Sequence, residues 1–169
     1  MIANILYYLK RWWMRITGEF PRLWKHYLYQ SFFAAIVVFI VLLVLTIEQA
    51  VIIASIGATA FIVFTMPRNV CARPRRVIGG HVVGLISGSL CALIPHPTTF
   101  TSILIIAFAV GVSICVMVAL DVEHPPASGT ALGVAITGFT PGAMIAVLTS
   151  SIILSLAHTF SKKFLRDLT

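Results

Sequence analysis

Positive charge is missing from two long stretches of this chain, because residues 26–67 and 77–161 contain neither lysine nor arginine. Charged residues of both signs make up 10% of the 169 residues, whereas soluble domains carry about 25%. Hydrophobic residues make up 59% of the chain. A cation at the centre of a bilayer helix costs roughly 2.5–3.5 kcal/mol. This distribution excludes an ordinary soluble domain and predicts a polytopic membrane protein.

The motifs of enzymes and metal proteins are missing as well. The three cysteines are far apart and form no Cys-x-x-Cys pair, so neither a zinc site nor a disulfide framework is indicated. The chain has no His-Glu-x-x-His, no glycine-rich phosphate loop and no ordered serine, histidine and aspartate set. Glu123 and His124 are adjacent, which is poor spacing for metal ligands on a helix. We expect no catalytic residue, no metal and no cofactor, and a membrane-embedded enzyme is the less favoured alternative.

The first thirty residues contain neither a signal-peptide core with a small-residue cleavage site nor the pattern of an organelle transit peptide. Residues 2–16 instead place apolar and aromatic side chains at helical spacing among cations, which is typical of an interfacial amphipathic helix. We expect residues 1–30 to form such an arm, interrupted at Pro21, with docking to a partner as its alternative use. The expected location is a plasma membrane, the inner membrane of a bacterial cell.

The cations gather in three clusters that flank the apolar segments. These clusters are Lys10, Arg11, Arg15, Arg22 and Lys25, then Arg68, Arg73, Arg75 and Arg76, then Lys162, Lys163 and Arg166. A net charge of +7 would suggest nucleic acid for a soluble protein, but the positive-inside rule explains it better here. We expect a lipid bilayer and no nucleic acid as partner. Six crossings place all three clusters and both termini in the cytoplasm, whereas four crossings with two re-entrant segments would place the loop 67–76 outside.

The apolar residues form six segments and predict an all-α transmembrane bundle. They cover roughly residues 31–47, 50–66, 77–94, 101–120, 127–139 and 142–160. A membrane span needs about 20 residues, so the segment 127–139 is too short and the segment 50–66 is marginal. We divide the chain into the arm, a membrane domain at 31–161 and a basic cytoplasmic tail at 162–169.

Two short stretches of the chain resemble each other. Residues 54–60 and 127–131 are both rich in small and hydroxyl side chains, and each opens a short apolar segment that ends near a proline. The chain then divides into two sets of three spans, and because three is odd the second set would be inverted. Paired short segments in inverted repeats point to a transporter site. The alternative is that these small residues only allow membrane helices to pack closely.

The densest polar run between two spans covers residues 121–130. Two prolines should break the preceding helix and start a new one, since proline is tolerated at the first helical turn. The free N–H groups of Ser128, Gly129 and Thr130 would then face the break, and a helix amino end attracts anions. Residues 57–59, which are Gly57, Ala58 and Thr59, could supply the opposing half of the site. This geometry suits a small anion.

Several titratable groups stand near this run or near its counterpart. His124 changes charge near neutral pH and could donate to the anion or relay a proton, or it could only cap a span. Ionised Asp121 and Glu123 would repel an anion unless they are protonated, paired with His124 or an arginine, or turned toward the cytoplasm. Glu48 raises the same question in the first half, where it could also be a solvated loop residue. The remaining two groups, Arg75 and His81, could belong to a cytoplasmic vestibule that attracts anions. Alternatively, Arg75 could anchor to lipid headgroups, and the neighbouring pair Gly79-Gly80 could only allow tight helix crossing.

These residues resemble a known family. The run His124-Pro125-Pro126 followed by Ala-Ser-Gly-Thr-Ala-Leu is similar to the signature of the HPP family of integral membrane proteins. The blocks at residues 57–67 and 73–81 resemble two further blocks of that family, so the resemblance covers about residues 31–160. Members have been associated with nitrite transport, so the resemblance implies a nitrite-like anion.

We therefore expect transport of a small monovalent anion, nitrite above all, through a site formed by the amino ends of broken helices. A channel and a carrier both fit, and the acidic and histidine residues permit proton coupling. A membrane scaffold without transport activity is the alternative from another class. Small residues on the third segment permit a homodimer or homotrimer.

Overall fold

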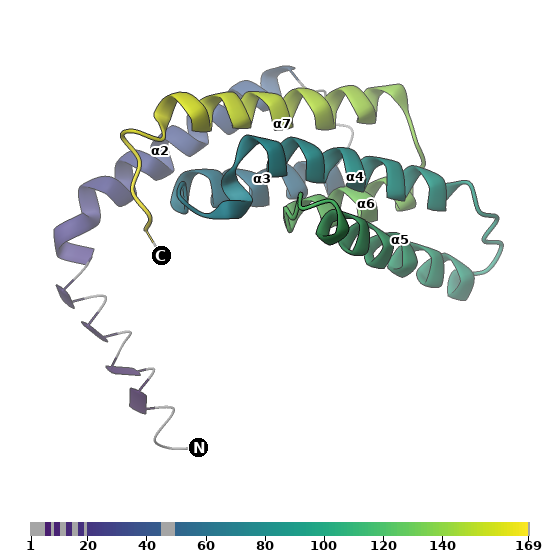
Figure 1. Ribbon diagram of the computed structural model, residues 1–169, viewed down its shortest axis with the longest axis horizontal. Helices are drawn as coiled ribbons and strands as arrows, with labels where there is room; N and C mark the ends of the chain where they lie inside the picture. Colours follow the sequence, from purple (N-terminus) through teal and green to yellow (C-terminus); the bar gives the residue numbers. More distant parts are fainter. Residues whose placement is uncertain are drawn as a thin grey trace.

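A computed structural model of the protein describes residues 20–44 and 50–168, together with residues 6–7, 9–10, 13–14 and 17–18. Glu48 lies outside the described residues, so its expected role stays a prediction. The regular elements are helices, as the sequence predicted, and Figure 1 shows their arrangement. They are α2 (Phe20–Val44), α3 (Ala50–Thr65), the short 3-10 helix η2 (Val70–Ala72), α4 (Pro74–Ala92), α5 (Thr99–Ala119), α6 (Pro126–Thr137) and α7 (Pro141–Ser161).

Three of these helices are long and apolar enough to cross a membrane. They contain the segments Pro21–Val41, Thr99–Ala119 and Pro141–Ser161. Helix α3 has 16 residues and α6 has 12. At 1.5 Å per residue these helices are about 24 Å and 18 Å long, which is less than the ~30 Å of a hydrocarbon core. The two segments that the sequence marked as short are therefore short in the structure.

Proline and threonine set most helix starts. Pro74, Pro126 and Pro141 each stand in the first turn of their helix, where the missing N–H costs no hydrogen bond. Thr98 accepts from the N–H of Thr101 and so caps α5. Pro21 also lies in a first turn, that of α2. Helix α2 begins at Phe20 and continues through residue 31 without a break, so the first apolar helix starts earlier than the expected residue 31, whereas the arm at 1–30 stays a prediction.

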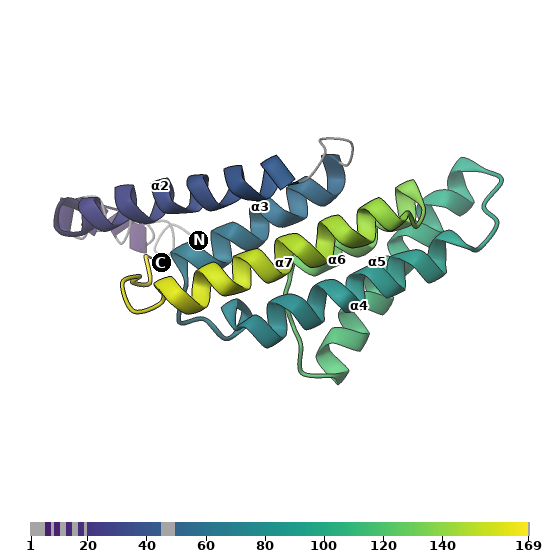
Figure 2. The same ribbon diagram turned by 90° about the horizontal axis from the view of Figure 1, so that it is seen from above.

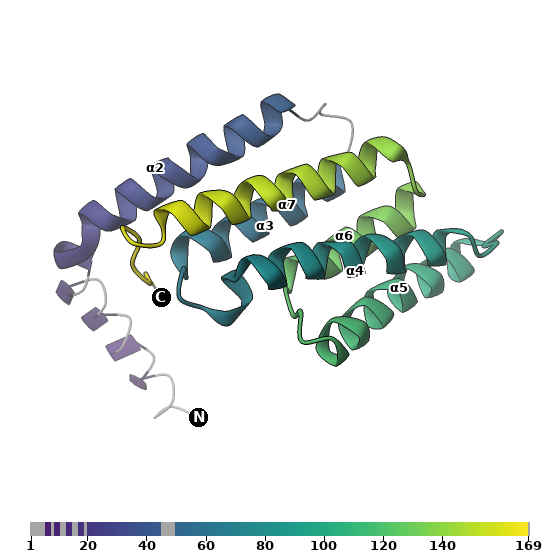
Figure 3. The ribbon, with the colours of Figure 1, turned by 45° about the horizontal axis from the view of Figure 1, so that its top comes forward.

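Consecutive helices run in alternating directions along one long axis, and the chain between α3 and α4 lies at the same end as the C-terminal tail (Figures 2 and 3). Hydrogen bonds hold this end together. The Gln30 side-chain amide donates to the carbonyl oxygens of Phe64 (2.6 Å) and Arg166 (2.8 Å). The N–H of Arg68 donates to the Asp167 carboxylate at 3.0 Å. The second and third cationic clusters therefore meet at one end of the bundle.

Glycines let α4 and α6 approach backbone to backbone. A Cβ atom at Gly88 would lie 2.6 Å from the carbonyl oxygen of Ala131, and one at Gly80 would lie 2.7 Å from the Cβ of His124. Only a residue without a side chain fits at these two positions. The glycine pair named from the sequence, Gly79 and Gly80, packs mainly against Val122 and His124 of the loop between α5 and α6, whereas Gly84 and Gly88 make the tight crossing of α4 with α6.

Candidate functional site

Five buried polar side chains meet where α3, α4, α6 and the loop between α5 and α6 come together. They are Ser55, Thr59, His81, His124 and Thr130, each at most 4% exposed. We call them the imidazole–hydroxyl cluster. Polar side chains inside a membrane bundle are expensive and usually mark a functional site. Four of the five were named from the sequence.

Thr59 is the centre of the imidazole–hydroxyl cluster. Its Oγ1 lies 2.9 Å from Nε2 of His81 and 2.9 Å from Nε2 of His124. The same oxygen lies 3.0 Å from the carbonyl oxygen of Ser55, one helical turn earlier. The two imidazole rings are 5.2 Å apart between centroids. One hydroxyl group therefore joins two histidines that come from different parts of the fold.

Thr130 closes the other side of the cluster from α6. Its Oγ1 lies 2.9 Å from Nδ1 of His81 and 2.9 Å from Oγ of Ser55. Ser55 in turn donates to the carbonyl oxygen of Pro126 at 2.5 Å. Both nitrogens of His81 thus contact a threonine, one from α3 and one from α6.

His124 is held by the loop before α4 as well as by Thr59. Its Nδ1 donates to the carbonyl oxygen of Cys71 at 2.9 Å, because a carbonyl can only accept. Desolvation by burial lowers the pKa of His124 to about 4, while the hydrogen bond to Cys71 acts in the opposite direction. The His124 imidazole is therefore neutral near pH 7 in this conformation, with its proton on Nδ1.

The helical period explains which predicted residues enter the cluster. Ser55 and Thr59 are four residues apart and share one face of α3, as side chains at i and i+4 do. Gly57 and Ala58 lie between them and are exposed on other faces. All of these positions lie inside α3, which begins at Ala50. The expectation that Gly57, Ala58 and Thr59 form a helix amino end is therefore wrong, although Thr59 is central to the site.

The start of α6 also differs from the expectation. The N–H of Ser128 donates to the carbonyl oxygen of Pro125 at 3.1 Å, and its hydroxyl donates to the same oxygen at 2.7 Å. The prediction of a free Ser128 amide is wrong, because the residues before α6 already follow a helical turn. Gly129 faces Ser55, since a Cβ added to it would lie 3.5 Å from the Ser55 Cβ. Of the three residues at 128–130, Thr130 alone places its side chain in the cluster.

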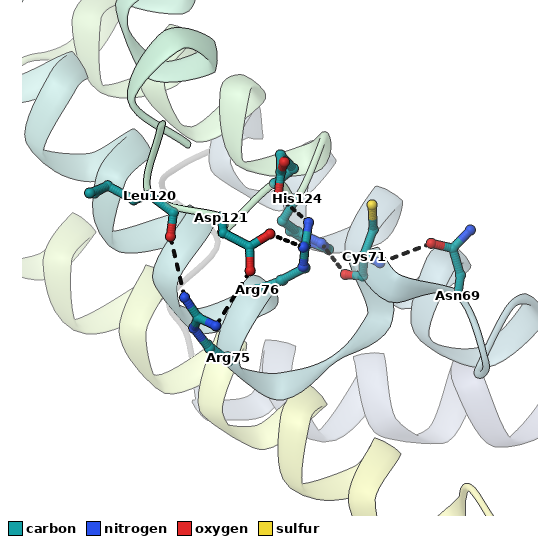
Figure 4. Close-up of polar contacts among 8 residues, drawn as sticks. Asn69, Cys71, Arg75, Arg76, Leu120, Asp121 and His124 are labelled. Carbon is teal, nitrogen blue, oxygen red and sulfur yellow. Dashed lines mark hydrogen bonds and ion pairs between the residues drawn. The ribbon is translucent and has the colours of Figure 1, made fainter. Parts of the chain in front are cut away.

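The predicted carboxylates pair with arginines beside the cluster (Figure 4). Arg76 contacts both Asp121 and Glu123, and Arg75 lies 3.5 Å from Asp121. Arg75 also donates to the carbonyl oxygen of Leu120 at 3.3 Å. We call these four side chains the ion-pair cluster. It fastens the loop between α5 and α6 to the start of α4 and leaves the described carboxylates outside the imidazole–hydroxyl cluster.

The imidazole–hydroxyl cluster consists of groups that donate and accept hydrogen bonds. Within the residues that the structure describes, no group of three or more histidine, cysteine, aspartate or glutamate side chains is placed to hold a metal ion. The cluster contains hydroxyl and imidazole groups and no carboxylate. Such a set can donate to an anion, and it can gain positive charge only by protonation of a histidine.

Comparison with known proteins gives two matches. A family model described as "HPP, transmembrane region" matches residues 21–167. A transmembrane protein of Dictyostelium discoideum is 34% identical over 85 residues, which are 50% of this chain and 30% of that protein. The chain therefore matches less than a third of the length of this relative. No solved structure matches the chain.

Proposed function

The chain belongs to the HPP family of transmembrane proteins, as its motifs predicted, and from this premise we propose that it transports a small monovalent anion, nitrite above all. The imidazole–hydroxyl cluster is the proposed binding site. In this conformation the site is closed, and its side chains occupy one another's hydrogen-bonding positions. An anion that enters takes the place of these internal contacts.

One observation carries this proposal: five buried polar side chains converge from three helices and a loop and contact one another across these elements. Packing alone would be served as well by alanine or valine, since burying a polar group without a partner costs free energy. Thr59, His81 and Thr130 also come from separate helices, so a small relative movement of these helices opens the contacts between them.

The charge distribution supports an anion over a cation. Asp121 and Glu123 are engaged by Arg76, and Asp167 accepts from the N–H of Arg68. No described carboxylate is left to balance a cation in the imidazole–hydroxyl cluster. The cluster offers hydroxyl and imidazole donors instead, and the cations at the same end of the bundle attract anions from solution.

The helix contacts support the proposed topology of six crossings in two inverted triplets. If α2, α3 and α4 correspond to α5, α6 and α7, each substantial helix contact has a counterpart. The α2–α3 contact matches α5–α6, the α3–α7 contact matches α6–α4, and the α2–α7 contact matches α5–α4. Thr59 of α3 and Thr130 of α6 lie on the two helices that the repeat pairs, and they contact opposite nitrogens of His81. The anion site then lies where the two repeats meet. Both termini lie on the cytoplasmic side of the expected plasma membrane.

Uptake by proteoliposomes tests the proposal with a matched pair of variants on α3. Thr59→Val removes the hydroxyl that joins the two histidines and preserves the side-chain shape. Thr65→Val is the control, because the Thr65 hydroxyl donates to a carbonyl one turn earlier, at 2.7 Å, in the same local pattern. We expect Thr59→Val to reduce nitrite uptake at least tenfold, which is on the order of one lost charge-assisted hydrogen bond. Thr65→Val should leave uptake within twofold of the wild type.

The baseline is protein-free liposomes, because protonated nitrite crosses lipid unaided. Equal uptake by the two variants would place the anion site elsewhere. If the reconstituted wild-type protein carries none of nitrite, nitrate, chloride and formate above that baseline, the transport proposal fails and a scaffold role is favoured.

A further inference from the structure

The imidazole–hydroxyl cluster holds fewer hydrogens than its contacts require. With both imidazoles neutral, the five side chains carry five polar hydrogens, one on each hydroxyl and one on each ring. They make seven contacts within hydrogen-bonding distance: three with the carbonyl oxygens of Cys71, Pro126 and Ser55, and four among themselves. Each contact needs one hydrogen, so the neutral cluster leaves two contacts without one.

The direction of each hydrogen bond shows where the shortage lies. His124 donates from Nδ1 to Cys71, so its Nε2 accepts from the Thr59 hydroxyl. Thr59 then has no hydrogen left for the Ser55 carbonyl, and it accepts from Nε2–H of His81. Nδ1 of His81 must accept from Thr130. Because Ser55 donates to Pro126, no hydrogen remains for the contact between Ser55 and Thr130.

Added protons supply the missing hydrogens at the same atoms. A proton on Nδ1 of His81 makes this nitrogen a donor, and the Thr130 hydroxyl turns to donate to Ser55 Oγ. A proton on Nε2 of His124 frees the Thr59 hydroxyl to donate to the Ser55 carbonyl. Every heavy-atom position stays as it is, and only hydroxyl hydrogens rotate. The arrangement of donors and acceptors therefore suits a protonated cluster as well as a neutral one.

The neighbouring charges do not by themselves hold a proton in the cluster. Arg75, Arg76, Asp121 and Glu123 balance one another in the ion-pair cluster. Cys71 contributes its carbonyl oxygen, and His158 of α7 is bonded to the carbonyl oxygen of Pro67 at 2.8 Å. The described parts of α3 and α6 carry no titratable side chain, and Cys115 of α5 is exposed. Only a negative charge that enters the cluster would compensate a buried imidazolium.

We propose that the cluster binds one proton together with each anion and releases both on the other side, so that transport is an electroneutral proton–anion symport. This inference rests on the proposed anion transport and adds its coupling. The proton from solution is held on His81 or His124 while the anion occupies the site, and it leaves with the anion. A bound anion stabilises the imidazolium, and the imidazolium strengthens binding of the anion. By thermodynamic linkage, the proton and the anion raise each other's affinity by the same factor.

The dependence of uptake on membrane potential tests the coupling. Wild-type proteoliposomes at pH 7.5 receive nitrite under a potassium diffusion potential of about 100 mV, with a pH-sensitive dye inside. A single anion carried alone would change its accumulation about 50-fold across this potential. We expect protein-dependent nitrite accumulation to change less than twofold, with one proton entering for each nitrite. A 50-fold response with no dye signal would overturn the symport and leave the transport proposal standing, whereas no uptake above protein-free liposomes would overturn both.

A double variant assigns the proton to the two histidines. His81→Gln combined with His124→Gln keeps a side-chain donor and acceptor at each position and removes both titratable rings. We expect at least a tenfold loss of nitrite-dependent proton entry, with His96→Gln, in the exposed turn before α5, unchanged as control. Proton entry at the wild-type rate in the double variant would overturn the assignment. If the double variant does not fold, the potential dependence of the wild type still decides the coupling.

Discussion

The ion-pair cluster and the imidazole–hydroxyl cluster lie next to each other, but the first is charged and partly exposed and the second is uncharged and buried. Arg76 and His81 stand on the same helix, and Glu123 and His124 are consecutive in the chain. The Arg76 side chain pairs with two carboxylates, of which Asp121 is 62% exposed. The imidazole–hydroxyl cluster, one helical turn further inside, contains no ionised carboxylate or arginine and is fully enclosed.

The contrast between the two clusters shows that this protein tolerates charged groups at the edge of the bundle. An ion pair at the edge of the bundle keeps some hydration, so its desolvation cost stays small. The same ion pair inside the bundle would carry a desolvation penalty of several kcal/mol per ion. The interior therefore uses hydroxyl and imidazole groups that are neutral, and we propose that the imidazoles become charged only when a proton enters with the anion. The ion-pair cluster fixes the loop, and the imidazole–hydroxyl cluster is the site that we propose for the anion.

The largest expected effect comes from the close approach that places His124 inside. Gly80→Ala adds a Cβ 2.7 Å from the Cβ of His124 and forces the loop away from α4. We expect a loss of about 3 kcal/mol in stability, the upper end for overpacking, and loss of nitrite uptake. The measurement is thermal unfolding of the purified protein in detergent, followed by uptake.

Gly111→Ala on α5 is the matched control, since a Cβ at Gly111 meets nothing within 4 Å. Alanine is the better helix former by roughly 0.5–1 kcal/mol, so this variant should be as stable as the wild type or more so. A Gly80→Ala protein as stable as Gly111→Ala would contradict the described packing of α4 against the loop.

Acid should destabilise the imidazole–hydroxyl cluster more than its neighbour. The pKa of His124 falls from 6.5 to about 4 on folding, so the unfolded chain binds more protons between these values. Stability is therefore lost as the pH falls through this window. From pH 7 to pH 5 the loss amounts to about 2 kcal/mol at 1.36 kcal/mol per pKa unit. Thermal unfolding midpoints at both pH values measure it without added anion.

The His124→Gln variant should show a smaller drop between pH 7 and pH 5 than the wild type, because glutamine does not titrate. An unchanged drop in this variant would mean that other groups cause the acid sensitivity. Burial of His124 would then not explain why acid destabilises the imidazole–hydroxyl cluster more than the ion-pair cluster.

The smallest expected effect separates the two arginines of the ion-pair cluster. Arg76 is 15% exposed in its side chain and holds two carboxylates, whereas Arg75 is 70% exposed. We expect Arg76→Gln to cost about 1–2 kcal/mol and Arg75→Gln less than about 0.5 kcal/mol, as surface pairs usually do. Unfolding in detergent at low and high salt checks both values. Equal losses would show that exposure does not rank these pairs.

Much of the fold was readable from the sequence. The last five predicted segments agree with α3 to α7 within three residues at each end, because proline and threonine mark the starts and apolar runs mark the lengths. The sequence does not reveal the start of α2, because Pro21 fits a break in the chain as well as the first turn of a helix. The small residues of the third segment indicate close helix packing, and Gly84 and Gly88 make the close contact of α4 with α6.

The site was predicted in part, and the errors have one physical cause. Thr59, His124 and Thr130 were chosen as consecutive motifs, but a helix brings together residues four apart. Ser55 was missed although it stands in the same stretch as Thr59, and its spacing of four residues was the available signal. Gly57 and Ala58 were included for the same reason. The pairing of Asp121 and Glu123 with Arg76 depends on a distant contact between α4 and the loop, so the sequence left it as one of several alternatives.

The most direct test of the central claim is a crystal structure of the protein with bromide at pH 5.5, which locates the anion by its anomalous signal. We expect bromide between Thr59, His81 and Thr130, with these three side chains moved apart and within hydrogen-bonding distance of the ion. Bromide bound only among the surface cations, with the imidazole–hydroxyl cluster closed as it is here, would show that the cluster is not the anion site.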